Sequence, residues 1–278
     1  MLLWAALFLI IIAISALLAY QSMKDYEQKP TSAGIPYSLF LIKNPQALLK
    51  VIDLLHEALL KEGHLIAFER LFKGSQSALV VYGPRNLLLR LSPDLNLLEL
   101  EEYAKVDPSQ VVAWEVGTKD QVSFHLDKFN VFEGLPSLQP GEQFWWQIVL
   151  QPTKGPLWPN LNSKRKILDL VGKDKTYLLN LQKMFTSHPQ LKEIAVRKNQ
   201  QKTFQAQIRA VLVSFDSKRR ENVSGQLANL ANGKLVKLPK PFTSEQILDL
   251  YNQRSKSHPQ GLILTSEEVL KLTGVVKD

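Results

Sequence analysis

Basic side chains are the residues of this sequence whose type and spacing fit a binding chemistry. They form two runs of three, which are Lys164, Arg165 and Lys166, and Lys218, Arg219 and Arg220. Runs of lysine and arginine neutralise the phosphates of DNA or of anionic lipids. The chain carries a formal net charge of +8, which agrees with such a partner. Solvated surface loops have the same composition, so both interpretations stay open.

Residues that could carry catalysis do not form a recognisable pattern. The chain has no cysteine, and its five histidines are widely separated, so a metal-ligand spacing is missing. Glycine-lysine pairs occur at 172–173 and 233–234 without the rest of a phosphate-binding loop. The carboxylates Glu99, Glu101 and Glu102 fit a solvated strand face better than an acid/base pair. We therefore predict no catalytic residue, no cofactor and no metal, and a protein that is not an enzyme.

The N-terminal segment is apolar and predicts a transmembrane anchor. Residues 1–20 contain no charged side chain. At about 1.5 Å per residue they span roughly 30 Å, the thickness of a hydrocarbon core. Positive charges follow the segment, so the positive-inside rule predicts an inner-membrane protein, held by residues 2–19, with its body in the cytoplasm. A cleaved signal peptide is the alternative, although no Lys or Arg precedes the apolar run.

The remainder of the chain predicts a linker and two lobes. Polar residues, proline and glycine at 21–36 indicate the linker. Apolar periodicity over 37–135 predicts the β-α-β-β-α-β order of a ferredoxin-like unit. Residues 136–278 contain two strongly alternating segments, at 143–151 and 204–215, and two helices that begin with capping boxes. The predicted fold class is α+β, with an N-terminal transmembrane helix followed by two α+β lobes.

The segment LILTSEEVLKLTG, residues 262–274, predicts a short strand followed by a capped helix. Thr265 and Glu268 have the spacing of a capping box, and Gly274 suits a left-handed helix end. The segment has more apolar surface than two helical turns can bury alone, contributed by Leu264, Val269, Leu270 and Leu272. An isolated helix of this length is marginal in water. Either the core of the body or a partner must therefore cover these four side chains.

GEQFWWQIVLQP at 141–152 and GLILTSEEVLKL at 261–272 resemble parts of the N-terminal region of conjugative-transfer ATPases, the type IV coupling-protein class, in the form found in candidate-phyla bacteria. LNLLELEEY at 95–103 and FQAQIRAVL at 204–212 fit the same pattern in the same order. The resemblance covers roughly residues 35–274. In that family a membrane segment precedes an α+β region, and a P-loop motor follows the capped helix. The resemblance implies that here the motor is a separate protein.

The resemblance implies a membrane-anchored, non-catalytic component of a type IV secretion or conjugative DNA-transfer system. It would tether or dock a separate P-loop motor ATPase through Leu264, Val269, Leu270 and Leu272. DNA and a second copy of the chain are further candidate partners. No catalytic residue is carried over, because the nucleotide-binding motifs of the family lie beyond these residues. The alternative function is a structural assembly protein of a cell-envelope complex with no nucleic-acid role, and an enzyme with an unrecognised site is a third.

Overall fold

The computed structural model describes residues 35–117, 131–132, 135–154, 193, 198, 200–227, 235–238, 242–257 and 262–276. Within them, nine strands, five α-helices and two 3-10 helices are present. In chain order these elements are β1 (Tyr37–Ile42), η1 (Pro45–Ala47), α2 (Leu48–Glu62), β2 (Ile66–Lys73), β3 (Gln76–Pro84), α3 (Arg85–Leu95), β4 (Leu97–Leu100), η2 (Pro108–Gln110), β5 (Val111–Gly117), β6 (Gln143–Pro152), β7 (Thr203–Val213), α7 (Ser217–Leu227), β8 (Val236–Lys237), α8 (Ser244–Gln253), β9 (Leu262–Thr265) and α9 (Ser266–Leu272).

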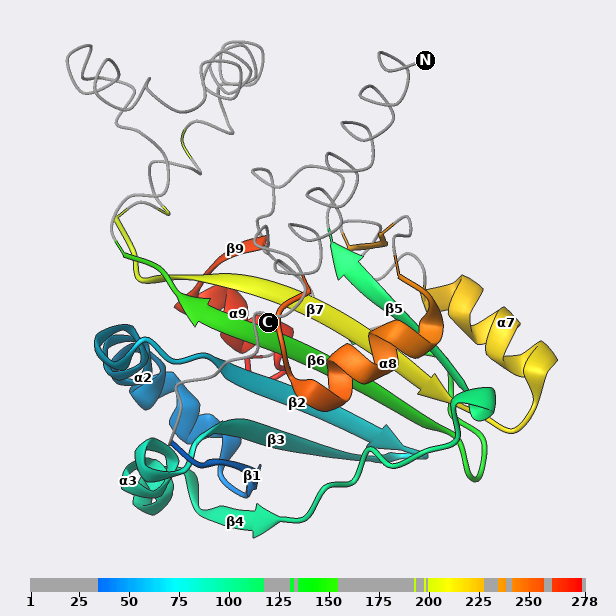
Figure 1. Cartoon of the computed structure of the whole chain (residues 1–278), viewed down its shortest axis with the longest axis horizontal. Helices are drawn as coiled ribbons and strands as arrows, with labels where there is room; N and C mark the ends of the chain where they lie inside the picture. The colour runs from blue at the N-terminus through cyan, green and yellow to red at the C-terminus, as the bar shows by residue number, and fades with distance from the viewer. Residues whose placement is uncertain are drawn as a thin grey trace, which may run out of the picture.

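All nine strands of the described residues belong to one antiparallel sheet (Figure 1). The strand order is β4-β1-β3-β2-β6-β7-β5-β8, and β9 pairs with β7 beside β5. The pairing of β2 with β6 joins the two halves of the chain, from Ile66 opposite Leu150 to Lys73 opposite Gln143. The expected fold of two lobes is therefore corrected to one continuous sheet. The predicted boundary between residues 135 and 136 is not tested by the sheet and stays a prediction of where one folding unit ends and the next begins.

The first half of the sheet is built from the order β1-α2-β2-β3-α3-β4. Helix α2 turns its apolar stripe to the sheet, so that Leu48, Ile52, Leu55 and Leu59 are buried. It ends at Gly63, which takes the left-handed conformation (φ 72°) that glycine adopts without steric cost. The chain can then reverse into β2. The local pattern of apolar residues and turn residues thus accounts for these elements.

Helices cover both faces of the central strand β6. Its neighbouring tryptophans point to opposite faces, and both are buried, at 1% exposure for Trp145 and 0% for Trp146. Trp145 stacks on Tyr251 of α8, with ring centroids 5.6 Å apart, and α8 lies across that face in Figure 1. Trp146 Nε1 donates a hydrogen bond to the carbonyl of Leu272 at the end of α9 (3.1 Å). The strand is therefore covered on both sides, as tryptophans on both of its faces require.

The transmembrane architecture expected from the sequence is corrected. No helix in the part of the chain that the structure describes is long and apolar enough to cross a bilayer. The longest described helix, α2, has only 15 residues, and its side chains are buried on one face and exposed on the other. A spanning helix needs about 20 apolar residues. Residues 1–20, where the anchor was expected, lie outside the described residues. The expected inner-membrane location is corrected with the architecture, since none of the described helices supports it.

Candidate functional site

The four apolar side chains that we expected to dock a partner lie in the core of the protein itself. Leu264, Val269, Leu270 and Leu272 are between 0% and 5% exposed. The two capping-box side chains are in place, since Thr265 accepts from the N–H of Glu268 and Glu268 accepts from the N–H of Thr265. Helix α9 packs on α2 and over Trp146. Docking of a motor through these residues is therefore wrong, because the body's own core already covers them.

The basic run on α7 is largely engaged with the protein. Arg219 Nε lies 3.1 Å from Glu142 Oε1 in an ion pair. Arg220 Nη1 donates a hydrogen bond to the Ser214 carbonyl (2.5 Å). Lys218, in contrast, is exposed. The other candidate run, residues 164–166, lies outside the described part of the chain. The structure thus leaves only Lys218 of the α7 run projecting as a contact for nucleic acid or lipid.

The Glu142–Arg219 ion pair makes stability depend on pH. Burial by itself raises the pKa of Glu142, but hydrogen bonds from the Gln139 amide and from Arg219 outweigh it, and the pKa lies below its usual 4.5. A carboxyl whose pKa is lowered on folding stabilises the protein above its unfolded pKa, and the contribution disappears as pH falls through the folded pKa. Glu142→Gln is therefore expected to lower the free energy of unfolding by about 1 kcal/mol at neutral pH and by less near pH 3.

Urea denaturation of the wild type and the variant at both pH values measures this effect. Glu221→Gln is the matched control, because Glu221 lies on the exposed face of α7. It should change the free energy of unfolding little at either pH. If Glu142→Gln lowers the free energy of unfolding equally at the two pH values, the effect does not come from the carboxylate charge.

A row of four polar side chains crosses the sheet beneath α8. Glu69 on β2, Gln147 on β6, Arg209 on β7 and Glu115 on β5 stand directly opposite one another in the strand register. Directly opposite residues share one face of a sheet. Gln147 Nε2 donates to Glu69 Oε1 (2.9 Å), Arg209 Nη1 donates to Gln147 Oε1 (2.9 Å), and Arg209 Nε lies 3.7 Å from Glu115 Oε1. All four are buried, and we call them the polar row.

The polar row holds the C-terminal end of α8. Arg209 donates to the carbonyls of Leu250 (3.1 Å) and Ser255 (2.5 Å), and Gln147 donates to the carbonyl of Tyr251 (2.8 Å). The last carbonyls of a helix have no partner within the helix, and a positive charge there also interacts favourably with the helix dipole. Burial lowers the pKa of Arg209 to about 10, and Glu115 opposes this shift, so the guanidinium is charged at neutral pH.

Arg254, the C-cap of α8, extends the network to the first half of the chain. Its backbone is left-handed (φ 51°), a conformation that a non-glycine residue adopts only at some cost. Its guanidinium bonds Glu69 at 2.9 Å and both carboxylate oxygens of Glu102, at 2.6 and 3.1 Å. Tyr103 donates its hydroxyl proton to Glu69 and meets the Tyr251 hydroxyl at 2.7 Å. Burial raises the pKa of both tyrosines well above 10, so both keep their protons.

This network is a structural clamp. Its hydrogen bonds join groups inside the protein, and none of its members lines the cleft between α2 and α9. Among the described residues, no group of three or more His, Cys, Asp and Glu side chains is placed to hold a metal ion. Sequence reasoning missed the network, although a signal was present: each of the four strands carries at least one charged or amide side chain within a mostly apolar segment.

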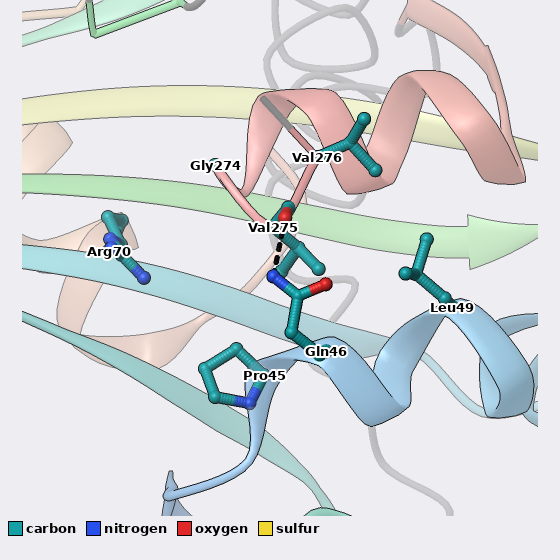
Figure 2. A pocket seen from close by; sticks show the side chains of 7 residues that line it. All are labelled: Pro45, Gln46, Leu49, Arg70, Gly274, Val275 and Val276. Atoms are coloured by element: carbon teal, nitrogen blue, oxygen red, sulfur yellow. Dashed lines mark hydrogen bonds between the residues drawn. The ribbon is translucent and has the colours of Figure 1, made fainter. Parts of the chain in front are cut away.

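A cleft of about 490 Å³ opens on the opposite face of the sheet, between the start of α2 and the end of α9 (Figure 2). Its lining residues are Pro45, Gln46, Leu49, Arg70, Gly274, Val275 and Val276. Gln46 Nε2 donates to the Val275 carbonyl (3.1 Å), which ties one wall to the other. Arg70 comes from β2 and contributes the only charged side chain among these lining residues. The cleft therefore combines apolar walls with one cationic side chain, a lining that can bind another molecule.

Comparison with known proteins does not assign a family. No family model matches the sequence, and no curated protein is similar to it. The resemblance to coupling ATPases therefore rests on the four sequence segments alone. The assignment to secretion or conjugation has no support from these comparisons.

Proposed function

We propose that this chain is a non-catalytic docking component of a DNA-transfer system and that it binds a separate P-loop motor ATPase. The observation that carries the proposal is the position of the segments that resemble coupling ATPases. Three of the four form adjacent strands, since β6 pairs with β7 over ten positions and β7 pairs with β9 over four. If the four segments descend from one ancestral domain, they should pack against one another in the structure. These three do.

The fourth segment belongs to the same packed unit. Residues 95–103 contain β4 and then Glu102 and Tyr103, which bond to Arg254 and Tyr251 of the α8 region. The segment therefore reaches from the edge of the sheet to the clamp over its centre. This arrangement supports treating the four segments as one domain of common origin, and it supplies the reason to look for the partner that such a domain has in the related proteins.

Affinity purification of the tagged full-length chain from its own cells tests the proposal. We expect a P-loop ATPase to be retained in near-stoichiometric amount, and its rate of ATP hydrolysis to change when the purified chain is added. The purified chain alone should hydrolyse no nucleotide. The matched control is the tagged double variant Val269→Asp/Leu270→Asp, which is expected not to fold and should retain no ATPase.

Two results would overturn the proposal. Steady ATP turnover by the chain itself, persisting through further purification, would show an enzyme. Retention of cell-envelope proteins without any P-loop ATPase would instead support the structural assembly protein.

A further inference from the structure

The cleft between α2 and α9 contains a cation, Arg70, that forms no ion pair with any carboxylate of the described residues. Its guanidinium carbon lies 6.0 Å from the centre of the Phe72 ring. Arg70 is half-buried, and its Nη2 donates to Ser77 Oγ (3.0 Å). Its Nε is buried and has no hydrogen-bond partner. Nowhere in the described part of the chain does a carboxylate form an ion pair with it, whereas Arg85, Arg90, Arg209, Arg219 and Arg254 all have one. Arg220 also has no ion pair there, but it bonds a backbone carbonyl. Burial lowers the pKa of Arg70, and no charged group opposes the shift.

An uncompensated, half-buried guanidinium is costly, and an incoming anion would recover that cost. The shape of the guanidinium favours a carboxylate, which can accept two parallel N–H bonds. The rest of the lining is mostly apolar: Leu49 is 50% exposed at the rim, and Val276 is half-buried on the opposite wall, next to the buried Val275. A free phosphate would leave the exposed parts of Leu49 and Val276 in water. A carboxylate flanked by apolar side chains would cover them.

We infer that this cleft binds a segment of a partner protein that presents an aspartate or glutamate between apolar side chains. The inference goes beyond the proposed function, since it requires no ATPase. The walls are already in position: Val275 N–H donates to the Leu270 carbonyl (3.1 Å), and Gln46 bonds the Val275 carbonyl. A preformed site of this kind binds its ligand without the free-energy cost of first ordering its walls. About 490 Å³ is room for a few side chains.

Two degenerate peptide libraries test the inference on the immobilised full-length chain. Both have random apolar residues on either side of a central position, which is Asp or Glu in one library and Asn or Gln in the other. The wild type is expected to retain the acidic library about tenfold better, the ratio typical of one charge-assisted pair. Arg70→Gln should abolish the preference, and Arg70→Lys should keep part of it.

Two further variants make the result specific. Arg90→Gln removes an exposed arginine from α3 and should leave the preference unchanged. Leu49→Asp keeps Arg70 but places a carboxylate at the rim, so it should weaken retention of the acidic library even if Arg70→Gln folds poorly. Equal retention of the two libraries by the wild type would overturn the inference. So would a preference that survives Arg70→Gln, displacement of the peptides by inorganic phosphate, or an Arg70-dependent dimer that occupies the cleft.

Discussion

A variant that carries both Val269→Asp and Leu270→Asp is expected to be unfolded at room temperature. The two side chains are 1% and 5% exposed, and α9 covers the face of the sheet that contains Trp146. An unpaired carboxylate buried in such a place costs several kcal/mol. The combined cost of two such carboxylates approaches the total free energy of unfolding of a typical domain, about 5–15 kcal/mol.

Near-UV circular dichroism and urea denaturation measure the outcome. Leu54→Asp is the control, because Leu54 lies on α2 but is 59% exposed. It should fold and melt like the wild type. A folded double variant that has lost only the binding of a partner would contradict the burial of α9 and restore it as a docking helix.

Arg209→Met is expected to lower the free energy of unfolding by about 3–5 kcal/mol, the range found when one member of a buried ion pair is removed. The substitution leaves the buried Glu115 without its cation and Gln147 without a donor. It also leaves the carbonyls of Leu250 and Ser255 without the guanidinium that now bonds them. The end of α8 should therefore loosen before the rest of the sheet, which hydrogen exchange can detect.

The control for Arg209→Met is Arg85→Gln. Arg85 makes two hydrogen bonds of 3.0 Å to Glu99, but both side chains are more than 40% exposed. Exposed pairs contribute little, so urea denaturation should show no measurable loss. The double variant Arg209→Met/Glu115→Met should recover part of the stability lost in Arg209→Met, because it removes both buried charges together. If Arg209→Met lowers the free energy of unfolding no more than Arg85→Gln does, the buried network does not act as a structural clamp.

The sequence by itself determined the local elements. Alternation of apolar residues located β6 and β7, and apolar periodicity over residues 37–135 predicted the order of elements from β1 to β4. The capping boxes of α8 and α9 are formed by the two pairs that their spacing predicts, Thr243 with Gln246 and Thr265 with Glu268. These features depend on residues within a few positions of one another, so their geometry is set by the local backbone.

Only the tertiary structure decided which surfaces meet. The apolar face of α9 was read correctly as a face that must be covered, but periodicity does not say whether core or partner covers it. The polar row brings together residues 69, 115, 147 and 209, and β2 joins β6 across 69 intervening residues, from 74 to 142. Such contacts follow from strand register, which places side chains opposite one another across the whole sheet. No local pattern contains that information, because register is fixed by the combined burial of many strands.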